Sequence, residues 1–324
     1  MRQKSRLHLA FACLCLVATN APAPAQDFPS RPIKLVVGFA PGGTTDFMAR
    51  LLADRLRSPL GQPVVVENRT GANGALGAEF VAKAEPNGYL LYFTTAGVAT
   101  VYPHLKPAPY DPIRDFAAVS RVAFNSTMLV VNAARAIHSA RDLAALAREK
   151  PGKLTIAITG IGSVSHLGAE LFQASAGIKL VEVPYRGAAP AMTDLLGGQL
   201  DALFGDGPTV IGHVGAGRIR AIAATSHVRS EIFPDVPTFL EQGFAGTAAD
   251  QWAGVLAPAG TPMAVLRRLN LAIAAAMSEP DVRARLAQNG VVPGTDSVED
   301  FESYLKLEYV RWGQIIREKG IKAE

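Results

Sequence analysis

The chain carries a glycine-rich turn whose main-chain groups could bind an anion. An apolar run at residues 33–39 predicts a buried strand, and a Pro-Gly-Gly turn follows it before a helix opens near Thr44. Glycines let the backbone approach a ligand, and the first turn of a helix leaves N–H groups without helical partners, which suits a carboxylate or phosphate. The predicted ligand-binding residues of this turn are Phe39, Ala40, Pro41, Gly42, Gly43, Thr44 and Asp46. Asp46 is so close to the helix start that its carboxylate should accept from main-chain N–H groups, and an ordinary capped turn is the alternative for the whole segment.

A similar turn lies in the second half of the chain, at residues 159–166. It also follows an apolar strand and opens a helix, so we expect it to face the same ligand. Its spacing resembles the dinucleotide fingerprint G-x-G-x-x-G, but Ser165 stands at the third glycine position, which disfavours a nucleotide. The predicted ligand-binding residues are Thr159, Gly160, Gly162, Ser163, Ser165 and His166. For His166 the alternative is a buried histidine with a structural role.

Other predicted strand ends add five candidate residues. Thr95 and Ala96 follow the third strand of the first half. Tyr185 could cover one face of a ligand and donate a hydrogen bond, and Arg186 could pair with a carboxylate, although a surface ion pair is equally compatible with its position. Asp206 could accept from a ligand hydroxyl or ammonium, and its alternative role is a helix N-cap.

Common catalytic and metal-binding patterns are missing from the sequence. It has no G-x-S-x-G, no H-E-x-x-H and no P-loop lysine motif. We therefore assign no catalytic residue, no metal ligand and no cofactor, and we do not expect an enzyme. Catalytic triads assemble from residues that are distant in sequence, so a periplasmic hydrolase or isomerase using Ser163 or His166 is kept as an alternative.

Strands and helices alternate along most of the chain, which predicts an α/β fold. We expect two lobes, each a mostly parallel sheet flanked by helices, with residues 26–125 and 251–324 in lobe 1 and residues 126–250 in lobe 2. Two chain crossings would then form a two-strand hinge. Ligand sites lie at the carboxyl ends of parallel strands and between domains, so the turns should meet in the cleft. A final amphipathic helix, capped by Ser297 and ended by Gly320, should dock on the first sheet.

The first 25 residues are typical of an export signal. Three basic residues precede an apolar stretch at residues 7–18, and Ala23-Pro24-Ala25 fits a cleavage site. The apolar stretch is too short to span a bilayer. This segment holds both cysteines and three basic residues but no acidic ones, so its removal lowers the net charge from +4 to +1. The remaining chain is predicted to be a soluble periplasmic protein that does not bind nucleic acid.

Ordered motifs along the whole chain resemble those of one family. They are Phe28-Pro29 with Arg31-Pro32-Ile33, Phe39-Ala40-Pro41-Gly42-Gly43 with Asp46, Val66-Glu67-Asn68-Arg69, Pro86-Asn87-Gly88-Tyr89, Pro184-Tyr185-Arg186-Gly187, Ala257-Pro258-Ala259-Gly260-Thr261-Pro262, and the closing helix with Trp312. Together they resemble the Bug family, the TctC-like solute receptors of tripartite tricarboxylate transporters.

The resemblance implies a two-lobed periplasmic binding protein of the type II kind that closes on a small organic acid or amino acid. It implies that main-chain groups of residues 40–44 and 160–166 hold a carboxylate, with Tyr185, Arg186 and Asp206 at the pocket wall. It also implies a monomer that works with membrane subunits of such a transporter. A sensory adaptor for a membrane kinase is the alternative among binding proteins.

Overall fold

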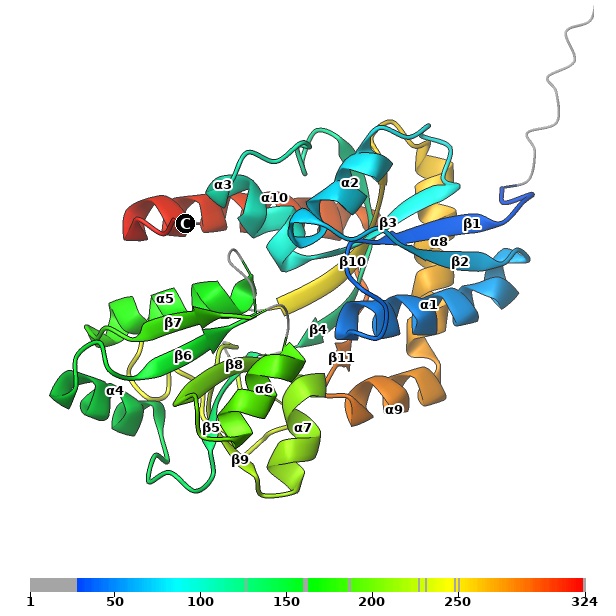
Figure 1. The fold of residues 1–324 in the computed structure, drawn as a ribbon. Helices are drawn as coiled ribbons and strands as arrows, with labels where there is room; N and C mark the ends of the chain where they lie inside the picture. Colours follow the sequence, from blue (N-terminus) through cyan, green and yellow to red (C-terminus); the bar gives the residue numbers. More distant parts are fainter. Residues whose placement is uncertain are drawn as a thin grey trace, which may run out of the picture.

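The computed structural model describes residues 28–125, 127–159, 163–185, 188–226, 228–230, 232–247, 249 and 251–322. Two sheets, each flanked by helices, form two lobes that lie side by side (Figure 1). Lobe 1 consists of the described parts of residues 28–125 and 251–322, and lobe 2 consists of the described parts of residues 127–249. The predicted export signal lies outside the described residues. None of the helices in the described ranges has an apolar stretch long enough to cross a membrane.

Lobe 1 is built on a six-stranded sheet with strand order β11-β4-β10-β3-β1-β2. Successive side chains of β1 point to opposite faces, so Leu35 and Val37 pack with α1 and α8, whereas Val36 packs with α2 and α10. The elements of lobe 1 in chain order are β1 (Ile33–Val37), α1 (Thr44–Leu60), β2 (Val64–Asn68), η1 (Ala72–Gly74), α2 (Ala75–Ala82), β3 (Leu90–Thr95), the π-helix η2 (Gly97–Val101), α3 (Tyr102–Leu105), β4 (Phe116–Asn125), β10 (Gln251–Pro258), α8 (Met263–Ser278), α9 (Pro280–Gln288), β11 (Val292–Pro293) and α10 (Val298–Lys319).

Lobe 2 is built on a five-stranded sheet with strand order β7-β6-β8-β5-β9. Leu129 and Val131 of β5 pack with α4 and α5 on one face, while Met128 and Val130 pack with α6 and α7 on the other. The elements are β5 (Thr127–Asn132), α4 (Ala140–Glu149), β6 (Thr155–Ile158), α5 (Val164–Ala176), β7 (Val181–Pro184), α6 (Ala188–Leu196), β8 (Ala202–Asp206), α7 (Gly207–Gly215) and β9 (Ile219–Ala224).

The chain passes between the lobes after β4 and returns before β10, and these two strands pair antiparallel. In lobe 2, β5 pairs antiparallel with both β8 and β9. Among the described strands, parallel pairing is confined to β2-β1-β3 and β7-β6-β8. The sheets are therefore mixed, and the expectation of mostly parallel sheets was wrong. A strand that leaves a lobe and the strand that returns to it must run in opposite directions.

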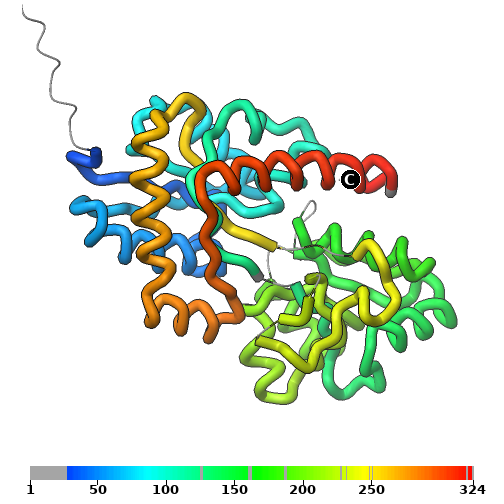
Figure 2. Tube along the Cα trace, turned by 180° about the vertical axis from the view of Figure 1, so that it is seen from behind, coloured from blue at the N-terminus to red at the C-terminus, as the bar shows by residue number. Residues whose placement is uncertain are grey.

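The final helix behaves as its sequence predicts. Ser297 accepts from the N–H of Asp300 at 3.0 Å, and Gly320 adopts a left-handed conformation at the other end of α10. Phe301 and Trp312 of this helix are fully buried against the sheet of lobe 1. Seen from behind, α10 runs along lobe 1 and its C-terminal end reaches over lobe 2 (Figure 2).

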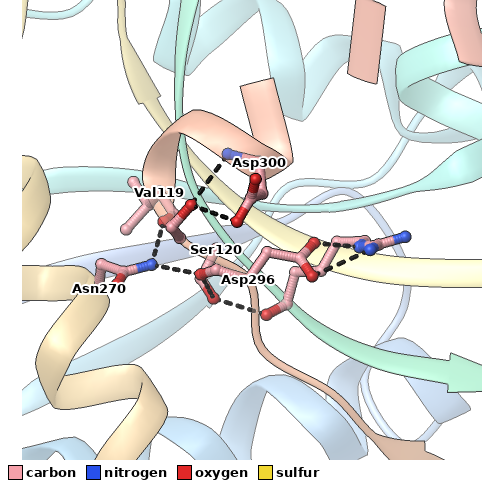
Figure 3. A network of polar contacts seen from close by, with 7 residues as sticks. Val119, Ser120, Asn270, Asp296 and Asp300 are labelled. Atoms are coloured by element: carbon pink, nitrogen blue, oxygen red, sulfur yellow. Dashed lines mark hydrogen bonds and ion pairs between the residues drawn. The ribbon is translucent and has the colours of Figure 1, made fainter. Parts of the chain in front are cut away.

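A polar network fixes the start of this helix to the hinge strand β4 (Figure 3). Asn270 of α8 donates to the carbonyl oxygens of Val119 and Asp296, at 2.8 and 2.7 Å. The Asp296 carboxylate forms a two-point ion pair with Arg121 of β4, with one contact at 2.9 Å. The guanidinium of Arg121 also lies 3.7 Å from the ring centroid of Tyr304. This end of the hinge is therefore anchored to lobe 1.

Candidate functional site

A cavity of about 970 Å³ lies between the two lobes. The corners that follow β1 and β3 in lobe 1 line it together with those that follow β6 and β8 in lobe 2. Eleven of the residues predicted from the sequence contribute to its wall: Phe39, Ala40, Pro41, Gly42, Gly43, Thr44, Thr95, Thr159, Ser163, Ser165 and Asp206. The fold thus brings the first glycine-bearing turn together with Thr159, Ser163 and Ser165, the described residues of the second turn, more than a hundred residues away.

Helix N-termini are the dominant feature of this cavity. Residues at the starts of α1, α5, α6 and α7 line it, the first from lobe 1 and the other three from lobe 2. Figure 1 shows α1 facing lobe 2 at the boundary between the lobes. Each helix start carries a partial positive charge of about half an elementary charge. Four such ends on one cavity produce a positive potential that favours an anion.

The start of α1 is open to the cavity. The first helical hydrogen bond runs from the N–H of Phe47 to the carbonyl of Gly43, at 2.9 Å. The N–H groups of Thr44, Thr45 and Asp46 therefore precede the helical ladder. Gly43 is the N-cap and has no side chain to satisfy them. These amides are available to a ligand carboxylate.

Asp46 supports this turn from behind and lies outside the cavity lining. Its carboxylate accepts from the N–H of Gly42 at 2.9 Å, from Nε of Arg50 at 2.8 Å and from Nδ2 of Asn68 at 2.8 Å. Burial alone raises the pKa of Asp46, but these hydrogen bonds outweigh it and hold the pKa below its ordinary value. Asn68 also donates to the carbonyl of Phe39 at 2.9 Å. The network fixes the shape of the turn and leaves its outer face to the ligand.

Three hydroxyl groups gather at the start of α5. Ser165 Oγ lies 2.8 Å from both Thr159 Oγ1 and Ser163 Oγ, and it accepts from the N–H of Thr159 at 2.9 Å. Ser163 is the N-cap and accepts from the N–H of His166 at 3.3 Å. All three hydroxyl residues line the cavity. The cluster offers polar contacts next to a helix start in lobe 2. Gly160 and Gly162 lie outside the described residues.

Charged side chains are scarce on the described part of the cavity wall. No described lining residue is Lys or Arg, and Asp206 is the single carboxylate among them. Asp206 is the N-cap residue of α7 and accepts from the hydroxyl of Thr209. Burial, assisted by the charge of Arg218, lowers the pKa of His213, so this lining imidazole is neutral at neutral pH. Main-chain dipoles therefore provide most of the positive potential in the described site.

Two lining side chains have buried polar atoms with no hydrogen-bond partner among the described residues. They are Oε1 of Gln251, on the returning hinge strand β10, and Nδ1 of His213 near the end of α7. A buried acceptor without a partner carries a cost of about 1–3 kcal/mol, which a ligand donor would remove. Sequence reasoning missed both residues, because neither belongs to a strand-to-helix turn.

Several predicted residues lie elsewhere. Ala96 is buried in the core of lobe 1 and is not part of the described lining. Tyr185 is also outside the lining: its hydroxyl donates to Asp194 at 2.6 Å, a hydrogen bond that raises the pKa of Tyr185 to about 12. His166 lines a different cavity. Arg186 lies outside the described residues. Neighbouring side chains on a helix or strand point in different directions, so a residue next to a ligand-binding loop can face away from the ligand.

Apolar residues complete the wall, and no sequence pattern distinguishes them from core residues. Phe47, Met192, Leu196 and Phe204 line the cavity alongside Phe39. Their spacing on helices and strands is the ordinary spacing of core residues. The cavity therefore combines polar helix starts with an apolar floor, which suits a small acid with a carbon chain.

The chain is similar to known proteins over most of its length. The sequence profile of the tripartite tricarboxylate transporter family receptor matches residues 48–321. The chain is 38% identical to Protein BugT of Bordetella pertussis over 304 residues, which is 93% of each protein.

Solved structures give the same result. Rpa4515 of R. palustris with adipate is 34% identical, with a TM-score of 0.84 over 91% of this chain and 99% of that one. MatC from Rhodopseudomonas palustris with bound malate is 30% identical, with a TM-score of 0.81 over 89% and 100%. Similar structures include periplasmic binding proteins, which confirms the predicted two-lobed fold. The chain belongs to the tripartite tricarboxylate transporter receptor family.

Proposed function

We propose that this protein is a periplasmic receptor that captures a small carboxylate-bearing solute between its lobes and delivers it to the membrane subunits of a tripartite tricarboxylate-type transporter. The observation that carries the proposal is the convergence of four helix N-termini from both lobes on one cavity. The predicted export signal at residues 1–25 supports the periplasmic location.

A dicarboxylate fits this arrangement better than a monocarboxylate. Helix starts face the cavity from both lobes, so each end of a diacid can meet main-chain donors. A hydrogen bond to a charged group contributes roughly 1.5–3 kcal/mol. Four or five of them supply roughly 6–15 kcal/mol before the losses of association, and micromolar binding corresponds to a net value of about 8 kcal/mol. Adipate and malate, the molecules bound to the two relatives, are both diacids.

A hydroxyl or ammonium group on the ligand would complete the site. The Asp206 carboxylate and Oε1 of Gln251 are acceptors on the wall, and a simple diacid dianion donates nothing to them. A hydroxy- or amino-diacid supplies the missing donor while its carboxylates face the helix starts. We therefore place polar-substituted diacids first among the ligands.

Binding requires lobe closure about the two crossings, which we place between β4 and β5 and just before β10.

A receptor role also fits the geometry better than a hydrolase. Ser163 lines the cavity between the lobes, whereas His166 lines a separate one, so this pair does not converge on a shared substrate. A sensory adaptor would use the same closure and differs only in its membrane partner.

Mass spectrometry of small molecules released from protein purified without denaturation tests the proposal, combined with thermal unfolding against a panel of acids. We expect one acid per chain and a rise in Tm with that acid, because a ligand that binds only the native state stabilises it. The absence of any stabilisation across mono-, di-, hydroxy- and amino-diacids would contradict the proposal.

A further inference from the structure

A second cavity, of about 780 Å³, lies on another face of α5. Lobe 2 provides most of its wall from α5 and β7, and residues 320–322 at the end of α10 close it from lobe 1. In both overall views the end of α10 lies beside α5 (Figures 1 and 2). The two cavities share no described lining residue. This second cavity has no part in the proposed receptor site.

Three side chains capable of binding a metal ion meet at the wall of this cavity. His166 and Glu170 lie one turn apart on α5, and Glu182 comes from β7. The Nε2 atom of His166 is 3.3 Å from Oε2 of Glu182 and 3.9 Å from Oε1 of Glu170. One ligand atom from each residue lies within 4.8 Å of the others. The imidazole is almost completely buried, at 4% exposure, while both carboxylates are partly open to the cavity.

Neighbouring groups hold one of these carboxylates in place. Gln173 donates from Nε2 to Oε1 of Glu182 at 2.8 Å, which leaves Oε2 directed at the imidazole. Gln173 is itself fixed, because its Oε1 accepts from the N–H of Leu180 at 2.7 Å. Such outer contacts orient the ligands of metal sites and are a common part of their construction.

The two carboxylates of the cluster make no close ion pair with a described lysine or arginine, although Lys179 and Lys322 line the same cavity. Each approaches only His166 among the described basic groups. One ligand atom of each residue lies within reach of a single point, so one divalent cation could contact both carboxylates and the imidazole at once.

We propose that His166 Nε2, Glu170 and Glu182 form a binding site for a divalent transition-metal ion, with Zn²⁺ as the best fit. One imidazole nitrogen and two carboxylate oxygens match the ligand preferences of zinc, and they leave a fourth position that cavity water can fill. Calcium and magnesium favour an all-oxygen shell and are disfavoured by the imidazole. The ion would tie β7 to α5 beside the end of α10.

Isothermal titration calorimetry with ZnCl₂ on chelator-treated full chain tests this site directly. We expect one Zn²⁺ per chain, tighter binding than Ca²⁺ or Mg²⁺, and a rise in Tm that EDTA reverses. Co²⁺ should displace or replace the ion and give the absorption of a site with nitrogen and oxygen ligands. Tighter binding of Ca²⁺ or Mg²⁺ than of Zn²⁺ would overturn the assignment.

The substitutions E182Q and H166Q should each weaken Zn²⁺ binding by at least about tenfold. E182Q keeps the side-chain shape and removes a repulsive charge, so the variant should fold even if H166Q does not. The matched control is H138Q, which changes an exposed histidine elsewhere in lobe 2 and should bind Zn²⁺ like the wild type. Absence of Zn²⁺ binding, or equal binding by E182Q and the wild type, would refute the site. Neither result bears on the binding of organic acids.

Discussion

Gly207 and Gly290 bring the backbones of the two lobes into contact. Gly207 is the first residue of α7 in lobe 2, and Gly290 lies between α9 and β11 in lobe 1. A Cβ added at Gly207 would lie 2.3 Å from the carbonyl oxygen of Gly290 and 2.7 Å from its Cα. Ordinary van der Waals contacts of a Cβ begin at 3.4 Å. The substitution Gly207→Ala should therefore force the lobes apart by about 1 Å at this point.

The free-energy cost of this steric clash sets the expected loss of affinity for the captured acid. Overpacking against backbone atoms costs about 1–3 kcal/mol, and a more open arrangement of the lobes avoids it. Since 1.4 kcal/mol changes Kd tenfold, Gly207→Ala should weaken binding of the captured acid by roughly 5- to 150-fold. The backbone of Gly207 is outside the left-handed region, so alanine adds no strain within α7. We therefore expect no loss in the Tm of the ligand-free protein.

Calorimetric titration with the tightest acid of the panel measures this effect. The matched control is Gly212→Ala, since Gly212 lies in the same helix and an added Cβ there would have open space. Small-angle scattering should show that Gly207→Ala stays more open than the control when the acid is present. Equal affinities for the two variants would contradict the expectation that a close approach of Gly207 and Gly290 is needed for tight binding.

Three further substitutions test individual parts of the site. Asp46→Asn should lower the free energy of unfolding at pH 7 by about 1.5–3 kcal/mol, because the buried carboxylate no longer accepts from Gly42 and Asn68 as a charged group. The pKa of Asp46 is lower in the folded state than its ordinary value of 3.8. The difference in unfolding free energy between wild type and variant, measured by urea titration, should therefore disappear as the pH falls from 3.8 through the lower folded-state pKa. A difference that persists in acid would contradict this role of Asp46. Gln251→Leu should weaken the binding of a hydroxy-diacid by about 2- to 13-fold and leave the binding of the unsubstituted diacid unchanged. Equal losses of affinity for both acids in calorimetry would argue against a ligand donor at Gln251. Tyr185→Phe should leave Kd unchanged while Tm falls slightly with the loss of the bond to Asp194, and a large loss of affinity would return Tyr185 to the site.

Much of the fold could be predicted because local signals agree with the final structure. The helix from Ser297 to Gly320 has a capping residue, an apolar stripe and a glycine end, and it forms with those bounds. The turn at residues 39–46 is equally local, since Gly42 adopts a positive φ and the helix begins directly after Gly43. Such features depend on contacts within a few residues, which one sequence displays.

The remaining features depend on contacts between distant segments. The mixed character of both sheets follows from where the chain crosses between lobes, which periodicity does not reveal. Gln251 lines the cavity because β10 enters lobe 1 at that point. His166 lines the other cavity because successive side chains of one helical turn of α5 point to different faces. Phe204 and Met192 read as core residues in the sequence and become a cavity wall only when lobe 1 faces them.

Main-chain N–H groups at helix starts from both lobes are proposed to hold the carboxylates of one ligand. The most direct test compares, by calorimetry, the captured diacid with its uncharged diamide of the same length and shape. We expect one diacid bound per chain and loss of measurable binding for the diamide. Equal affinity for the two would contradict it, because the helix ends would then contribute nothing to recognition.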